Sequence, residues 1–209
     1  MPRRERENTL SSFVAALEAG AEGIELDVHA TADGVVVVHH DPCIPGELEI
    51  ARTDWVPLRR SAESGGIQMP TLDAVCDLVV DRVELFVEIK GVGIEEAVLR
   101  VLVQHRGRHA IHSFEHDTIG RLARRADPPR LGLLWEHRVP DVSALLATHG
   151  ARDAWPHHSL VDERMVAAVH GAGGRLIAWT ANTRADIARL TSLGVDGICT
   201  DDVTLMAAR

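Results

Sequence analysis

The sequence lacks the features that mark several classes of protein. Its three cysteines, Cys43, Cys76 and Cys199, are widely spaced and form no Cys-x-x-Cys pair, which argues against a disulfide framework or a zinc site. No run of about 18 apolar residues occurs, and the chain does not open on an apolar segment. The sequence therefore predicts neither a membrane span nor a signal peptide. We expect a cytoplasmic protein without stable membrane anchoring.

Positive charge is also scarce. Lysine and arginine together number 22 against 31 aspartates and glutamates, which gives a formal net charge of −9. Nucleic acids and anionic lipids are bound through clustered basic residues, so we expect no nucleic-acid partner. Lys90 is the only lysine in the chain. A lone lysine among arginines indicates that a compact point charge is needed there, although chance alone would also explain it.

Short β-branched runs alternate with amphipathic stretches, a pattern typical of repeated βα units around a parallel sheet. The expected strands are Ile24–Ala30, Val35–His39, Leu85–Ile89, Ala110–Phe114, Leu131–Trp135, Ala154–His157, Leu176–Thr180 and Gly197–Thr200, the second joined to the first as a hairpin through Asp33-Gly34. The expected helices lie around Thr9–Ala19, Thr71–Val80, Ile94–Gln104, Asp117–Ala126, Val142–Thr148, Asp162–Gly171 and Arg184–Leu193.

These elements predict one α/β domain over residues 1–209, a (β/α)8 barrel of the TIM type. Residues 42–70 lack a clean period, and their Pro, Gly and Ser content predicts a rim loop or a short insertion within the barrel. The chain supplies about seven of the eight βα steps and opens on a helix, so we expect the first strand to be missing from the N-terminus. Open edges at Ile24–Ala30 and Gly197–Thr200 would then favour pairing with another chain, which makes a homodimer our hypothesis.

Three polar residues share one face of the first expected strand. Glu25, Asp27 and His29 alternate with other residues, and alternate side chains of a strand point the same way. Two carboxylates at this separation repel each other unless a cation or an arginine neutralises them. The pattern favours a site for Mg²⁺ or Ca²⁺, which prefer oxygen ligands. The alternative is a pair of surface carboxylates on an edge strand.

A further carboxylate, Glu88, lies near the carboxyl end of the strand Leu85–Ile89, with Lys90 two residues on and facing the same way. Barrel enzymes place their chemistry at this end of the strands. Three carboxylates and a lysine can bind a dication and a phosphate anion together, with the metal polarising a phosphoryl oxygen. The alternative is a structural ion pair between Glu88 and an arginine on a helix.

The segment His39-His40-Asp41-Pro42 ends the hairpin and brings at least one imidazole to the mouth of the expected barrel. Histidine titrates near neutrality, and a positioned general acid or base is worth about 10²–10⁴-fold in rate. We choose His40 as the catalytic residue, with Asp41 as its candidate orienting partner. A histidine in an exposed loop is the alternative.

Several short motifs follow one another in a specific order: Glu-Asn-Thr-Leu at Glu7–Leu10, Gly-Ile-Glu-Leu-Asp-Val at Gly23–Val28, Asp33-Gly34, Val-Val-x-His-Asp ending at Asp41, Met-Pro-Thr-Leu at Met69–Leu72, Val-Glu-Ile-Lys at Val87–Lys90, Ser113-Phe114, Trp-Thr-x-Asn at Trp179–Asn182 and Gly-Val-Asp-Gly-Ile-x-Thr-Asp at Gly194–Asp201. In this order they resemble the glycerophosphodiester phosphodiesterase family over nearly the whole chain.

The resemblance implies a (β/α)8 barrel that hydrolyses a small-molecule glycerophosphodiester to glycerol 3-phosphate and an alcohol. It implies one divalent cation, Mg²⁺ or Ca²⁺, held by three ligands: Glu25, Asp27 and Glu88. It also implies that Lys90 contacts the phosphate, that His40 is one of two catalytic histidines, and that Trp179 is an apolar wall near the glycerol.

The chain departs from the family at its N-terminus. Family members carry a His-Arg-Gly at the end of the first strand, which the family spacing would put just upstream of Met1, and Arg6 replaces the proline that follows it. The missing histidine is the other acid/base group and the missing arginine grips the phosphate, so we expect impaired activity. Either the start lies inside the first strand, which we favour, or this is a short form that has lost activity. A chain extended upstream is expected to turn over at least about 10²-fold faster.

Two other functions stay open. A catalytically inactive barrel could bind a phosphodiester or a partner, and turnover with added Mg²⁺ or Ca²⁺ would distinguish it from an enzyme. A phospholipase D-like or cyclising activity on lysolipids would need exposed apolar surface, which residues 42–70 barely offer. As a second departure from the family, residues 42–60 lack the Arg-Thr-Thr that often follows the family's His-Asp and would contact the substrate. The histidines His112, His116, His157 and His158 could suggest another metal site, but we interpret them as packing residues. Asp201-Asp202 could reach the site from the end of the last strand, but we interpret the pair as a helix N-cap.

Overall fold

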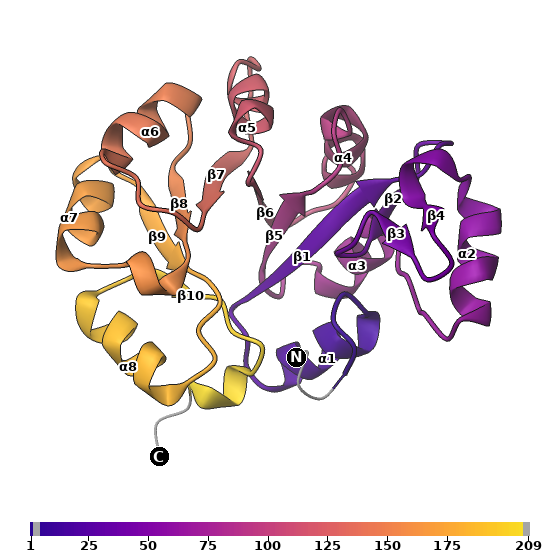
Figure 1. The fold of residues 1–209 in the computed structure, drawn as a ribbon, viewed down its shortest axis with the longest axis horizontal. Coiled ribbons are helices and arrows are strands. Elements are labelled where there is room, and N and C mark those ends of the chain that lie inside the picture. The colour runs from indigo at the N-terminus through magenta and orange to yellow at the C-terminus, as the bar shows by residue number, and fades with distance from the viewer. Residues whose placement is uncertain (2–4, 207–209) are drawn as a thin grey trace. The chain divides into compact units, whose positions relative to one another are not determined.

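The computed structural model describes Met1 and residues 5–206. It divides into two compact units, Met1–His109 and Ala110–Arg209. In each unit, strands alternate with helices along the chain (Figure 1), and the expected α/β class is confirmed. No described helix has the length and apolarity needed to cross a membrane. The organisation of residues 1–209 as a single domain stays a prediction.

The first unit is built around strand β1 (Gly23–Ala30). Strand β5 (Glu84–Ile89) pairs with β1 in parallel, and β2 (Val36–Val38) pairs with it antiparallel, which confirms the expected hairpin. Gly34 in the connecting turn has φ +83°, a conformation that glycine adopts without steric cost. Three helices accompany these strands: α1 (Leu10–Glu18), α3 (Leu72–Val79) and α4 (Glu95–Leu102).

Threonine side chains start two of these helices. Thr9 accepts a hydrogen bond from the backbone N–H of Ser12, and Thr71 accepts one from Ala74, contacts that each stabilise a helix by about 1 kcal/mol. Helix α3 buries the apolar residues that recur at helical spacing: Leu72, Val75, Cys76 and Val79. The sheet buries its own apolar positions, including Leu26, Val28, Leu85 and Val87.

The segment between β2 and α3 contains four short elements: β3 (Cys43–Ile44), β4 (Leu48–Glu49), the 3₁₀ helix η1 (Ile50–Arg52) and α2 (Trp55–Ser64). β3 and β4 form a small antiparallel pair. An apolar cluster lies within this segment and reaches Val37 of β2; its other buried members are Ile44, Ile50, Leu58, Ala62, Ile67 and Met69. Residues 42–70 therefore have a small core of their own.

The second unit is a succession of parallel strands and helices. The strands pair in chain order, and they are β6 (Arg108–Ser113), β7 (Arg130–Trp135), β8 (Asp153–Pro156), β9 (Arg175–Ala178) and β10 (Gly197–Ile198). The helices are α5 (His116–Ala123), α6 (Val142–His149), α7 (Glu163–Gly171) and α8 (Arg184–Leu193), with 3₁₀ helices η2 (His158–Leu160) and η3 (Val203–Leu205). Asp202 accepts from the N–H of Thr204 and starts η3, which confirms the N-cap interpretation for this residue.

The parallel strands number two in the first unit and five in the second, so the described residues contain the seven expected from the sequence. The first described element is α1. The edge of β1 that we expected to be open is partly covered, because β2 pairs with Val28–Ala30 and the N–H of His39 donates to the carbonyl of Asp27 at 3.0 Å. Whether the chain forms a homodimer stays a prediction.

Candidate active site

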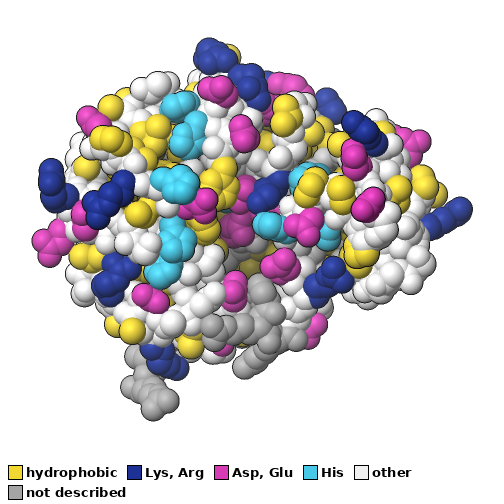
Figure 2. Space-filling model, viewed as in Figure 1, with side chains coloured by type: hydrophobic (Ala, Val, Ile, Leu, Met, Phe, Trp, Pro, Cys, Tyr) yellow, Lys and Arg dark blue, Asp and Glu magenta, His cyan; other side chains and the backbone are white. Residues whose placement is uncertain are grey.

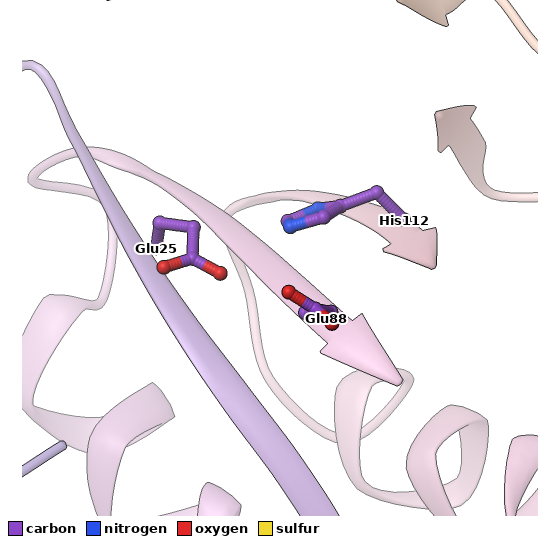
Figure 3. Close-up of side chains that lie close together, drawn as sticks. All are labelled: Glu25, Glu88 and His112. Atoms are coloured by element: carbon purple, nitrogen blue, oxygen red, sulfur yellow. The ribbon is translucent and has the colours of Figure 1, made fainter. Parts of the chain in front are cut away.

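Three carboxylates gather in the first unit where β1 lies beside β5. The parallel register sets Asp27 opposite Glu88, and Glu25 lies two residues before Asp27 on the same strand face. Carboxylate oxygens of Glu25 and Glu88 lie within 4.8 Å of each other, and the two groups point toward one another in Figure 3. His112, also labelled in Figure 3, comes from β6 and stacks on Trp155 of the second unit with ring centroids 4.4 Å apart.

The lone lysine follows directly on the last residue of β5. The ammonium nitrogen Nζ of Lys90 lies 3.2 Å from Oε1 of Glu88 and 3.7 Å from Oδ1 of Asp27, so it bridges the two carboxylates. Burial lowers the pKa of Lys90, but Glu88 and Asp27 raise it by more, and the net pKa is above the ordinary value. This site therefore holds a fixed positive charge, and Glu88 pairs with the lysine that follows its own strand.

The carboxylates carry more charge than Lys90 neutralises. Burial is the main cause that raises the pKa of Glu25 well above its ordinary value, and the neighbouring carboxylate of Asp27 raises it further. A raised pKa means that the ionised form of Glu25 is disfavoured in its surroundings. A bound dication would supply the missing positive charge, and a set of carboxylate oxygens suits Mg²⁺ or Ca²⁺. Glu25 and Glu88 thus fit a divalent cation, and the role of Asp27 as a third ligand stays a prediction.

His40 lies beside this cluster. Its Nδ1 lies 2.8 Å from Oδ1 of Asp41, and its Nε2 lies 3.3 Å from Nζ of Lys90. Because an ammonium group can only donate, neutral His40 must accept at Nε2 and donate from Nδ1 to Asp41. The hydrogen bond to Asp41 is the main cause that raises the pKa of His40.

His29 of strand β1 contacts the backbone of the same segment. It is buried, and its Nε2 lies 3.2 Å from the carbonyl oxygen of His40. Burial lowers the pKa of His29, which favours the neutral imidazole. This arrangement fixes the backbone of His40 relative to β1, which carries two of the three carboxylates.

Asn8 belongs to this cluster but was not predicted as a site residue. Its amide nitrogen Nδ2 donates to Oδ2 of Asp27 at 2.9 Å, and its Oδ1 accepts from the backbone N–H of Asp27 at 3.3 Å. The only sequence signal for Asn8 was its place in the motif Glu7–Leu10. The pattern of alternation, which found Glu25 and Asp27, has no bearing on a residue that precedes a helix.

A His-Arg-Gly triplet does occur within the chain, at His105–Gly107, but away from the carboxylates. It follows α4, and such a connection from helix to strand lies at the amino ends of the strands in α/β folds. His105 is bound there by two aspartates of α3, with Nε2 2.9 Å from Oδ1 of Asp73 and Nδ1 3.4 Å from Oδ1 of Asp77. This triplet therefore does not supply a second catalytic histidine.

Trp179 lies in the second unit, directly after β9. Its indole N–H donates to the carbonyl of Trp155 at 2.9 Å, and the rings of Phe114 and His157 stand at right angles to it with centroids 5.3 Å away. A group of histidine side chains is visible on the surface over this unit (Figure 2). The second unit also contains His116, whose ring nitrogen Nε2 lies 2.8 Å from the carbonyl oxygen of Leu134, as expected of a packing residue.

A cluster of carboxylates with a lysine and a histidine can bind a divalent cation and a phosphate anion together. Comparison with known proteins specifies the class further. A family model described as the Glycerophosphoryl diester phosphodiesterase family matches residues 1–205. The chain belongs to this family of phosphoric diester hydrolases.

Individual relatives agree with this assignment. The chain is 32% identical to a glycerophosphodiester phosphodiesterase of Caldanaerobacter subterraneus over 94% of its own length and 88% of that protein. It is 29% identical to an enzyme of the same name from Bacillus altitudinis, covering 93% and 89% of the two chains.

Solved structures confirm the fold as that of a TIM-type barrel. A glycerophosphodiester phosphodiesterase from Thermotoga maritima superposes with a TM-score of 0.85 at 24% identity, over 98% of this chain and 92% of that one. A phosphodiesterase from Oleispira antarctica, solved with its product sn-glycerol-3-phosphate, gives a TM-score of 0.82 at 24% identity, over 93% and 87%.

Proposed function

We propose that the chain hydrolyses glycerophosphodiesters to glycerol 3-phosphate and an alcohol. The observation that carries this proposal is the position of the Lys90 ammonium, 3.2 Å from Glu88, 3.7 Å from Asp27 and 3.3 Å from His40. Acidic oxygens that can hold a metal cation and the imidazole of His40 thus lie around the positively charged ammonium group of Lys90. The family match over residues 1–205 and the names of the curated relatives support the same substrate class.

In this proposal Glu25, Asp27 and Glu88 hold one divalent cation, Mg²⁺ or Ca²⁺. Such a cation polarises a phosphoryl oxygen and stabilises the charge that develops on it, a contribution of several kcal/mol. Lys90 neutralises another phosphate oxygen as a compact point charge. The protein's own contribution is to fix these charges on two hydrogen-bonded strands, so that little reorganisation is needed when the substrate binds.

His40 is the proposed general acid/base. With its Nδ1 proton held by Asp41, the Nε2 lone pair of neutral His40 takes a proton from the attacking water molecule as the new P–O bond forms. The bond from phosphorus to the alcohol oxygen then breaks, and the His40 imidazolium returns that proton to the departing alcohol oxygen. Because His40 is the only acid/base histidine assigned here, we propose a slower rate than that of an enzyme with two. Trp179 is proposed as an apolar wall for the glycerol.

The proposal is tested by assaying release of glycerol 3-phosphate after metal removal. We expect a chelator to abolish turnover of glycerophosphocholine, and added Mg²⁺ or Ca²⁺ to restore it in the wild type but not in Glu88→Gln. The matched control is Glu84→Gln at the other end of the same strand, which should keep its activity. Equal turnover by Glu88→Gln and the wild type, with or without chelator, would overturn the proposal.

Two further results of this assay decide between the other functions. Binding of metal and glycerol 3-phosphate without any turnover would instead favour the inactive, binding form of the barrel. A preference for lysolipids over water-soluble glycerophosphodiesters would favour the phospholipase-like activity.

A further inference from the structure

We propose that Asn8 is a positioning residue that sets the rotation of the Asp27 carboxylate and so raises the affinity of the site for its cation. This inference rests on the proposed function, because it assigns Asn8 a role toward one of the proposed metal ligands. Asn8 itself is not proposed as a ligand. It acts through Asp27, which it contacts at two points.

The two contacts define the orientation of both groups. A backbone N–H can only donate and a carboxylate can only accept, so the Asn8 amide must place Oδ1 on the N–H of Asp27 and Nδ2 on its Oδ2. The distances are 3.3 Å and 2.9 Å respectively. One amide therefore grips both the backbone and the side chain of a single residue, which leaves the Asp27 carboxylate little freedom to turn.

The backbone conformation of Asn8 and the start of helix α1 both support this contact. Asn8 has φ +55°, in the left-handed region that residues with a side chain rarely adopt, although asparagine tolerates it better than most. Thr9, the N-cap of α1, follows directly: its hydroxyl donates to the carbonyl of Arg6 at 2.6 Å and accepts from the N–H of Ser12 at 3.3 Å. The start of α1 thus holds Asn8 in the turn from which its amide reaches β1.

The contact with Asn8 determines the direction of the other carboxylate oxygen of Asp27. With Oδ2 bound by Asn8, Oδ1 is the oxygen directed to Lys90, whose ammonium also contacts Glu88. The terminal torsion of an aspartate is otherwise broad, so Asp27 without Asn8 would present its oxygens in several orientations. Partners that orient a metal ligand in this way typically change metal affinity by about 10–100-fold when they are removed.

Two variants distinguish the effect of the Asn8 side-chain amide from the effect of its left-handed backbone conformation. Asn8→Gly keeps a residue that accepts the left-handed conformation but removes the amide. Asn8→Asp keeps the shape of the side chain but replaces the donor by a second carboxylate facing Asp27. The measurement is the dissociation constant of Ca²⁺ and of Mg²⁺ by titration calorimetry, together with the melting temperature of the metal-free protein.

We expect both variants to raise the metal dissociation constant by about 10–100-fold, and turnover to recover largely when the metal is raised to saturation. The matched control is Asn182→Asp in the second unit, because Asn182 binds Asp201 through the same pair of contacts, at 2.6 Å and 2.9 Å. It should lower the melting temperature and leave the metal dissociation constant unchanged.

The possible outcomes distinguish the two proposals. If the wild type binds the metal and both Asn8 variants bind it equally well, Asn8 has only a structural role and this inference is wrong, while the proposed function stands. The same conclusion follows if Asn182→Asp weakens metal binding as much as Asn8→Asp does. If the wild type binds neither Ca²⁺ nor Mg²⁺, both proposals fail.

Discussion

The two units hold their buried carboxylates in opposite ways. In the second unit, Asp153 is fully buried and is bound by Arg130 and Arg175 through several contacts of 2.7–3.0 Å. These three residues are the first residues of β7, β8 and β9, so they lie at the amino ends of adjacent parallel strands. In the first unit, Glu25, Asp27 and Glu88 have Lys90 as the cation between them.

The two clusters differ in charge balance, and this difference predicts a stabilising role for the Asp153 cluster and a binding role for the three carboxylates. One carboxylate with two arginines has its charge more than neutralised and its geometry fixed by bidentate contacts, an arrangement that stabilises the fold. Three carboxylates with one lysine keep an excess of negative charge, which costs stability and favours binding of a cation. In α/β barrels the amino ends of the strands are the stabilising face and the carboxyl ends carry the chemistry. Asp153 begins β8, whereas Glu88 is the last residue but one of β5.

Glu25→Gln should produce the largest effect, and it should move activity and stability in opposite directions. Activity is expected to fall by about 10²–10⁴-fold, because a proposed metal ligand is lost. The metal-free protein should melt at an equal or higher temperature at neutral pH, because the ionised form of Glu25 is disfavoured by burial and by Asp27. Kinetics and thermal unfolding of the same preparation check this. A lower melting temperature together with full activity would contradict it.

Asp153→Asn should show the reverse behaviour. Removing the charge leaves two arginines without their carboxylate, which for a buried pair costs about 3–5 kcal/mol. We expect about 3 kcal/mol, at the lower end, because the side chains of Arg130 and Arg175 are 35% and 27% exposed. Urea unfolding measures the loss. Activity well below the melting temperature should match the wild type, and a large loss of activity without destabilisation would show that this cluster is not structural.

Exchanging the two kinds of basic residue sharpens the comparison. Lys90→Arg replaces a point charge by a larger planar group, and we expect activity to fall about tenfold, equivalent to about 1.4 kcal/mol, with little change in unfolding. Arg175→Lys should instead lower stability by a similar amount, because it removes one side of the bidentate contact, and leave activity unchanged. Equal effects of both exchanges on activity would mean that the two clusters do not differ in role.

Asp41→Asn should give the smallest effect, and one visible mainly in the pH profile. The hydrogen bond from Asp41 is the main cause that raises the pKa of His40, so its loss should lower that pKa. The acidic limb of the activity profile should then move to lower pH, because His40 stays neutral further into acid. Both side chains are largely exposed, so the rate at the optimum should change by less than about fivefold. A shift toward higher pH would contradict the assignment of His40 as the base.

The fold could be predicted from the sequence largely because its signals are local. Each expected strand and helix is present within a few residues of its predicted bounds. Helix α2 (Trp55–Ser64) was missed, because only Leu58 and Ala62 of this segment are buried and Pro57 interrupts its pattern. A short helix with a narrow buried side gives too weak a period to be recognised.

The sequence predicted the parts of the site that follow from the alternation of side chains along one strand. Glu25 and Asp27 share a face because they are two residues apart, and Glu88 and Lys90 follow the same rule on β5. The pairing of Asp27 with Glu88 could not be predicted, because register depends on contacts between distant segments. Two other features also could not be predicted. The role of Asn8 depends on its left-handed backbone angle, and the cluster around Asp153 depends on three strands that begin side by side.

Lys90 also makes the proposed cation site accessible to spectroscopy without any mutation. Reagents that modify lysine side chains have one target in this sequence, the ε-amino group of Lys90. Reductive methylation with a ¹³C label would therefore place one side-chain NMR probe between Asp27 and Glu88. Its chemical shift would report directly on the binding of a metal or a phosphate, without any change in the amino-acid sequence.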